Sequence, residues 1–237
     1  NIDAGSFRPA GIIQIGPNVL GADEVITLRA LTGACFGNAK LVLVEPQEPI
    51  IKDLAATAVH VGLGPDRTRV VNAAMCPTSG HNLTLYKFKD GLCSDAEMNH
   101  AITMWSTLGG KDVLINTWKR NFLQRMIPTC IDDTELEASI FGVDVPCHTP
   151  ATLLELTGMK ASEVDFLFID AEGYDAEILD LFNSLPDFDP TTIVFEWAFH
   201  HASRGKLPLV VKVAKYWSDR GYLMYKDFDN LVMAKMS

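Results

Sequence analysis

Three carboxylates stand around a glycine in the stretch VDFLFIDAEGYDAEIL, which covers residues 164–179. Asp170, Glu172 and Asp175 follow an apolar run of strand length, and apolar residues then return at helical spacing. Carboxylates in such a place can bind a cationic ligand or take a proton from a reacting hydroxyl. They can also simply stabilise the N-terminus of the following helix. We expect the helix role for Asp175 and a functional role for Asp170 and Glu172, because ligands of open α/β sheets bind beyond the carboxyl ends of strands.

A second group of candidates follows the first two apolar runs. Residues 16–21 (GPNVLG) form a glycine turn after the run 11–15, and Glu45 ends the run 41–44. An acid at the end of the second strand is the placement that binds ribose hydroxyls. The turn lacks the middle glycine of a nicotinamide fingerprint, and the chain has no G-x-x-x-x-G-K-[ST] phosphate loop. A ligand with adenosine, a positive sulfonium and no phosphate fits these acids best, so the sequence predicts a site for S-adenosylmethionine.

Methyl transfer to a hydroxyl group requires that the acceptor lose a proton. The stretch EWAFHH places Glu196 at a strand end, with His200 and His201 in the following loop. The predicted catalytic residues are Asp170, Glu172, Glu196 and His200. An alternative is a divalent cation held by Asp170, Glu172 and Glu196 or His200, since oxygen-rich ligation suits Mg²⁺ or Mn²⁺. No spaced metal motif supports that alternative.

These candidates require elements that bring strand ends together. Apolar runs continuously rich in Val, Ile and Leu, separated by helical stretches, are typical of a parallel sheet that helices cover on both faces. Five residues join the last two runs, too few for a crossover, so those strands should be antiparallel. One helix is marked by Thr149 and Pro150 at its start and Gly158 at its end. The expected strands cover residues 11–15, 41–44, 68–74, 165–169, 192–195, 222–225 and 231–234.

The predicted fold is therefore α/β, with a doubly wound, mostly parallel seven-stranded sheet that ends in an antiparallel hairpin. Residues 75–148 interrupt the alternation, and the interruption is too long for a structureless connection. Within it, residues 82–88 alternate like an edge strand. We expect a single domain over residues 1–237, in which residues 86–148 form a substrate-binding or lid insertion between the third and fourth strands.

Six stretches in one order resemble the FkbM-type methyltransferases: IIQIGPN, LVLVEPQ, VVNAAMCPTSG, TPATLLEL, VDFLFIDAEGYDAEIL and TIVFEW. The resemblance covers roughly residues 11–197, and residues 86–148 match poorly. It implies a class I, Rossmann-like fold, S-adenosylmethionine as cofactor and a small-molecule acceptor, most often a sugar or natural product. It also implies that Gly16, Asn18 and Gly21 lie against the methionine portion, Glu45 holds the ribose, Ala73 or Ala74 lies near adenine and Asp170 faces the amino group or transfer centre. Pro17, Pro46 and Ala171 are expected to bind the cofactor together with these residues.

The composition narrows the remaining possibilities. Twenty basic and thirty acidic residues among 237 give a net charge of -10, which argues against a general nucleic-acid binder. No apolar run reaches the roughly 18 to 20 residues of a membrane span, and no signal peptide is visible. Five scattered cysteines without a C-x-x-C pair predict reduced thiols in a cytoplasmic protein. A homodimer is one possible assembly of the chain.

Four functions are compatible with these residues. The first is O-methylation of a sugar or natural-product hydroxyl, and the second is N-methylation of a peptide or amide. The third is a non-catalytic module that binds S-adenosylmethionine, suggested by Gln14 in the first strand and by the spacing of the glycine turn. A nicotinamide dehydrogenase is the fourth.

Overall fold

The computed structural model describes residues 11–17, 39–60, 63–94, 106–108, 110–112, 114–115, 133–171, 173–197 and 207–236. The chain divides into two compact units, one made of Asn1–Gly80 with Cys147–Ser237 and the other of His81–Pro146. The substrate-binding or lid role of residues 86–148 stays a prediction. None of the described helices has the length and apolar character needed to cross a bilayer.

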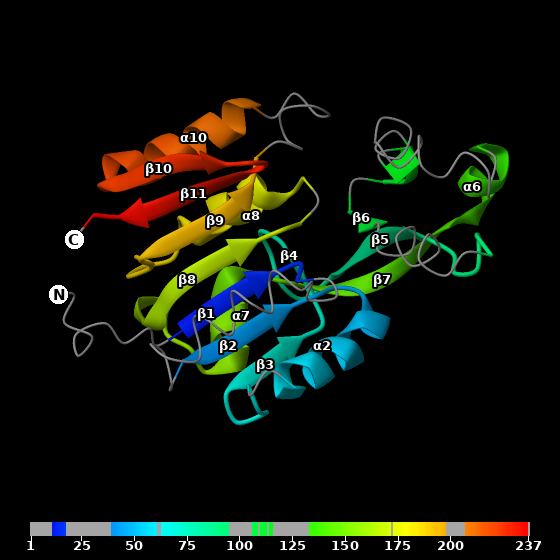
Figure 1. Ribbon diagram of the computed structural model, residues 1–237, viewed down its shortest axis with the longest axis horizontal. Helices are drawn as coiled ribbons and strands as arrows, with labels where there is room; N and C mark the ends of the chain where they lie inside the picture. Colours follow the sequence, from blue (N-terminus) through cyan, green and yellow to red (C-terminus); the bar gives the residue numbers. More distant parts are fainter. Residues whose placement is uncertain are drawn as a thin grey trace. The chain divides into compact units, whose positions relative to one another are not determined.

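A seven-stranded sheet forms the centre of the first unit, in the order β10-β11-β9-β8-β1-β2-β3 (Figure 1). Every neighbouring pair is parallel except β9 with β11 and β11 with β10. The predicted fold, a mostly parallel sheet that ends in an antiparallel hairpin, is confirmed. The strands are β1 (Gly11–Ile15), β2 (Lys40–Val44), β3 (Thr68–Val71), β8 (Val164–Ile169), β9 (Thr192–Glu196), β10 (Tyr222–Asp227) and β11 (Asn230–Lys235).

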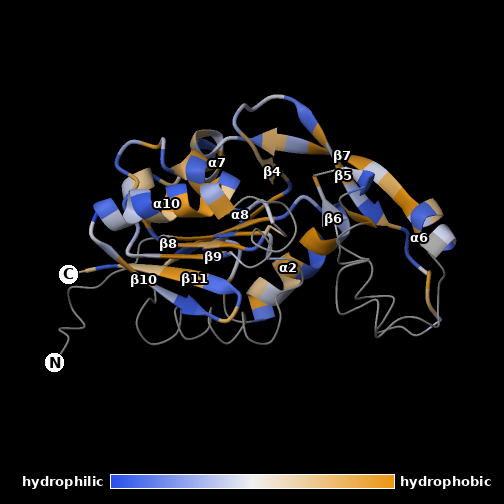
Figure 2. Ribbon diagram, turned by 90° about the horizontal axis from the view of Figure 1, so that it is seen from above, coloured by the Kyte–Doolittle hydropathy of each residue, from blue (hydrophilic) through white to orange (hydrophobic). Residues whose placement is uncertain are grey.

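Helices lie on both sides of this sheet (Figure 2). On one side are α7 (Pro150–Thr157), α8 (Asp175–Phe182) and α10 (Leu207–Asp219), and on the other is α2 (Glu48–His60). Ile12 and Ile13 point to opposite faces of β1, and neither side chain is exposed. Burial on both faces explains why the central strands read as continuous apolar runs without polar alternation.

The helix α7 begins and ends where its capping residues predict. The side chain of Thr149 accepts a hydrogen bond from the backbone N–H of Thr152, and Pro150 occupies the first turn. Gly158 ends the helix in the left-handed conformation, with φ of 65°. The three residues therefore fix both ends of the helix locally, independently of the sheet.

The second unit is built on an antiparallel ladder between β5 (Asn82–Phe88) and β7 (Ile140–His148). The short strand β6 (Ser106–Thr107) pairs with the other side of β5, and α6 (Asp133–Ser139) leads into β7. The expectation that residues 82–88 form an edge strand is therefore wrong, because β5 has a partner on each side. A small core gathers apolar side chains of this unit: Phe88, Cys93, Leu114, Leu136 and Ile140.

A disulfide joins Cys76 and Cys147 in the first unit, with their Cα atoms 5.9 Å apart. Cys93 is also disulfide-bonded. The prediction of reduced thiols is wrong for these cysteines, because the pairing of β4 (Ala74–Met75) with the end of β7 brings together residues 71 positions apart. The predicted cytoplasmic location rested on that prediction and loses its support, since disulfides persist in oxidising compartments.

Replacing both Cys76 and Cys147 with Ser should lower the free energy of unfolding by about 4 kcal/mol, the loop-closure entropy for a separation of this length. Urea unfolding without reductant measures this difference. Wild-type protein treated with dithiothreitol should lose at least as much stability. A double variant as stable as the untreated wild type would contradict the stabilising role of the disulfide.

Candidate functional site

The carboxyl ends of β2, β1 and β8 lie side by side (Figure 1). We call this side of the sheet, where the parallel strands end, the carboxyl edge. Backbone hydrogen bonds continue past the strands, from Gly16 N–H to the carbonyl of Val44 and from Asp170 N–H to that of Ile15, each 2.9 Å long. After β1 the chain builds β2 and β3 on one side, and β8 and β9 later fill the other. This reversal of strand order marks the position where open α/β sheets bind ligands.

Gly16 follows β1 at a close approach to the backbone that follows β8. Its φ is 72°, and a Cβ atom added there would lie 1.9 Å from the carbonyl oxygen of Asp170. Any side chain would therefore collide with backbone and would also adopt an unfavourable conformation. Backbone packing explains this glycine without reference to a ligand.

Asp175 is completely buried at the first position of α8. Its Oδ1 accepts hydrogen bonds from the backbone N–H groups of Ala171 at 3.2 Å and Glu196 at 3.4 Å, and its Oδ2 accepts one from Gly173 at 3.1 Å. Hydrogen bonds to a charged acceptor are stronger than neutral ones and offset the cost of burying it. Asp175 therefore joins the loop after β8 to the end of β9.

The expectation for Asp175 identified its position but missed this role. Asp175 does begin a helix, yet its carboxylate faces back toward the preceding loop and the neighbouring strand. The hydrogen bond from the backbone N–H of Glu196 to Asp175 joins residues 21 positions apart, and no local sequence pattern predicts it. Glu196 is half-buried at the end of β9, with its backbone held by Asp175.

Glu45 follows β2 and is 3% exposed. Its Oε1 accepts a hydrogen bond from the backbone N–H of Gln47 at 2.9 Å. Asn72 donates to the carbonyl oxygens of Glu45 and Pro46, both at 3.0 Å, and so ties the ends of β2 and β3 together. The small side chains of Ala73 and Ala74 are buried directly after β3.

The structure brings several of the predicted residues to one edge. Asp170 is exposed after β8, Ala171 is half-buried beside it and Pro17 is buried after β1. Their contacts with a ligand stay predictions. Four further predicted residues lie outside the described residues: Asn18, Gly21, Glu172 and His200.

The divalent cation gains no support from the described parts of the chain. No group of three close metal-ligand side chains found there contains Asp170 or Glu196. Glu172 and His200, the other two side chains of that hypothesis, fall outside those parts.

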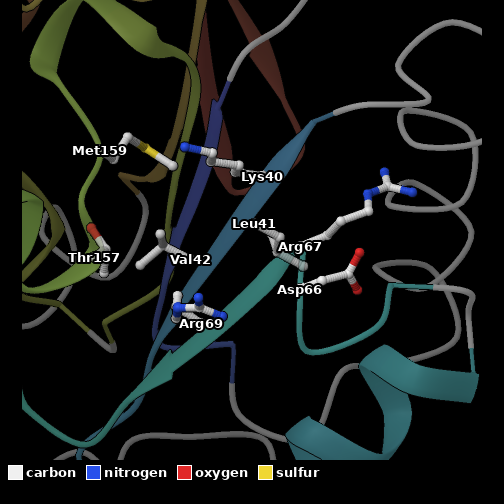
Figure 3. Close-up of a pocket in the computed structure, with 8 residues that line it drawn as sticks. All are labelled: Lys40, Leu41, Val42, Asp66, Arg67, Arg69, Thr157 and Met159. Atoms are coloured by element: carbon white, nitrogen blue, oxygen red, sulfur yellow. The ribbon is translucent and has the colours of Figure 1, made fainter.

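A separate small pocket, of about 70 Å³, lies near the amino ends of β2 and β3, away from this edge (Figure 3). Lys40 and Arg69 line it together with Thr157, the last residue of α7. The Arg69 guanidinium donates hydrogen bonds to the backbone carbonyls of Pro65 and Thr68, so contacts within the fold account for its position. Its lining residues are Lys40, Leu41, Val42, Asp66, Arg67, Arg69, Thr157 and Met159.

Comparison with known proteins matches this chain to one family. The model of the methyltransferase FkbM domain matches residues 15–224. No curated protein matches the chain.

Three similar solved structures are all distant from this chain. Methyltransferase FkbM from Methylobacillus flagellatus KT is 10% identical, with 96% of this chain and 44% of that chain covered and a TM-score of 0.49. The O-methyltransferase TomG from Streptomyces achromogenes, involved in tomaymycin synthesis and solved in complex with SAM, is 12% identical, with 96% and 74% covered and a TM-score of 0.41. The O-methyltransferase from Bacillus cereus, in complex with SAH, is 13% identical, with the same coverage and TM-score. At these values the likenesses assign no residue roles here.

Replacing Asp175 with Ala should lower the free energy of unfolding by about 3 kcal/mol, because three backbone N–H groups lose a charged acceptor in a buried place. Chemical denaturation measures the loss. The control is Asp180→Asn on the same helix, whose exposed pair with Lys212 should contribute about 1 kcal/mol or less. Equal losses in the two variants would show that the Asp175 contacts do not stabilise the fold.

Replacing Gly16 with Ala should cost about 3 kcal/mol of stability, from the collision with Asp170 and the positive φ together. Gly221→Ala is the matched control, since its φ is 89° but an added Cβ meets nothing within 4 Å. The control should cost about 1 kcal/mol. Thermal unfolding of both variants separates the two effects, and a Gly16 variant no weaker than the control would refute the close approach.

Proposed function

Because the chain belongs to the FkbM methyltransferase family, we propose that it transfers a methyl group from S-adenosylmethionine to a hydroxyl group of a sugar or natural product. The observation that carries the proposal is the edge where β1, β2 and β8 end. Asp170, an exposed carboxylate, follows β8 at this edge, and Glu45, a buried carboxylate, follows β2. The strand β1 lies between β8 and β2.

The residues at this edge fit the chemistry of the cofactor. The Glu45 carboxylate, fixed by Gln47, is suited to ribose hydroxyls, and the buried Ala73 and Ala74 are the residues proposed to lie near the adenine. Negative charge at Asp170 favours a sulfonium. The bound cofactor supplies an electrophilic methyl group. The residues proposed to hold it are Gly16, Pro17, Asn18, Gly21, Glu45, Pro46, Ala73, Ala74, Asp170 and Ala171.

The acceptor hydroxyl has to be held in line with the methyl group, about 3 Å away, and has to lose its proton. Among the described residues, Asp170 and Glu196 end adjacent strands at this edge, since Ile169 pairs with Phe195. We propose one of these two carboxylates as the base that accepts the proton, and Glu172 and His200 are the other candidates. Asp175 fixes the backbone of Glu196 and thereby acts as a positioning residue.

Two experiments test the proposal in sequence. Titration calorimetry of the purified chain should detect binding of S-adenosylmethionine and none of NAD. A methyl-release assay with sugars, phenols and peptides should then give turnover with a hydroxyl acceptor. Turnover on peptide nitrogens alone would favour the second function named above, and binding without any turnover would favour a non-catalytic module. Absence of binding would refute the family's activity for this chain.

Asp170→Ala should reduce turnover at least about 100-fold and leave the free energy of unfolding within about 1 kcal/mol of the wild type, since the side chain is exposed. Asp219→Ala is the control, because this exposed carboxylate, paired with Lys215, lies at the opposite end of the sheet, where β10 begins. Initial rates and urea unfolding measure the two effects. Wild-type rates in the Asp170 variant would disprove its assignment to the site.

A further inference from the structure

The turn between β10 and β11 lies at the same edge of the sheet as the candidate site (Figure 1). Asn230, at the start of β11, pairs with Glu196, at the end of β9. The backbone N–H of Trp197 donates a 2.9 Å hydrogen bond to the carbonyl oxygen of Asp229. Phe228 and Asp229, the two residues of the turn, therefore sit beside the end of β9.

Phe228 has no evident role in the fold. It is 88% exposed, more than any other large apolar side chain among the described residues. Its φ is 49°, although two-residue hairpin turns place Gly, Asn or Asp at positions of positive φ. The aromatic residue thus costs conformational energy without burying its ring. Such an outlier supports a hypothesis of function.

The base of the turn is anchored. The Nζ of Lys226 lies 4.7 Å from the centroid of the Trp197 ring, and Trp197 itself packs against the main core of the first unit. Phe228 therefore projects from a supported turn. Neighbouring strands lie about 4.8 Å apart, so β11 is about 10 Å from β8, with β9 between them. A sugar or phenol ring bound over the end of β9 would therefore lie between Phe228 and Asp170.

We propose that Phe228 is a specificity-determining residue that stacks against the apolar face of a ring-shaped methyl acceptor, while a hydroxyl group of that ring reaches toward Asp170 and Glu196. The inference rests on the proposed function and adds the acceptor's shape to it. Hydrophobic and aromatic side chains line most of a small-molecule site, and a few polar groups then fix the orientation of the ligand. Asp227 and Asp229, both exposed beside the ring, are available to the other hydroxyl groups.

Phe228→Gly and Phe228→Asn separate this role from a structural one, because both residues suit a positive φ better than Phe. Both variants should melt at or above the wild-type temperature and bind S-adenosylmethionine within about twofold of it. Their kcat/KM for nitrophenyl glycosides and simple phenols should fall at least about tenfold, mainly through KM. Phe228→Tyr should keep most of the activity. Leu223→Ala, which removes another exposed apolar side chain from the same hairpin, should change none of these values.

Three results would overturn the inference. The first is an unchanged kcat/KM in the Gly and Asn variants. The second is a change confined to the oligomeric state on gel filtration, which would make Phe228 a contact between copies of the chain. The third is a wild-type enzyme that binds the cofactor but methylates no ring-bearing acceptor. A wild type that fails to bind S-adenosylmethionine would instead refute the proposed function itself.

Discussion

The carboxylate of Asp175 is buried where two parallel strands end, and it accepts hydrogen bonds from backbone N–H groups on both sides of that junction. Strand ends leave donors without ladder partners, and such donors are costly when they are buried. One acidic side chain satisfies three of them and thereby sets the spacing between the loop after β8 and the end of β9. The positions of Asp170 and Glu196 depend on that spacing, so the proposed site depends on a residue that need not touch the reactants.

Backbone contacts fix the other side of the same edge. Gly16 allows the end of β1 to approach the carbonyl of Asp170, and Asn72 joins the ends of β2 and β3 through two carbonyl groups. These contacts use main-chain atoms and the half-buried amide of Asn72, and they hold the strand ends without the charge of Asp170 among their partners. A fold organised in this way can keep one cofactor crevice and vary the acceptor through surrounding loops and turns.

Local patterns predicted the sheet and the ends of α7, since continuous apolar runs and capping residues act within a few positions. They also placed Asp170 and Glu196 at one edge, because parallel strands end together. They missed three particular contacts between residues that are distant in sequence. The disulfide between Cys76 and Cys147, the second neighbour of β5 and the bond from Glu196 to Asp175 all arise from tertiary pairing. The residues that bind an acceptor are set by its shape, which strand patterns do not encode.

Two residues of this edge oppose the usual preferences of their types. Asp175 is a charge in the interior, and Phe228 is an apolar ring in solvent at a positive φ. Three backbone N–H groups donate hydrogen bonds to Asp175 and offset the cost of burying its carboxylate. For Phe228, with 88% of its surface exposed, the described chain offers no comparable compensation. Sequences usually satisfy local preferences except where function requires otherwise. Hydrogen bonds within the fold therefore account for Asp175. A ligand is the better explanation for Phe228, because no contact in the described chain offsets its exposure and positive φ.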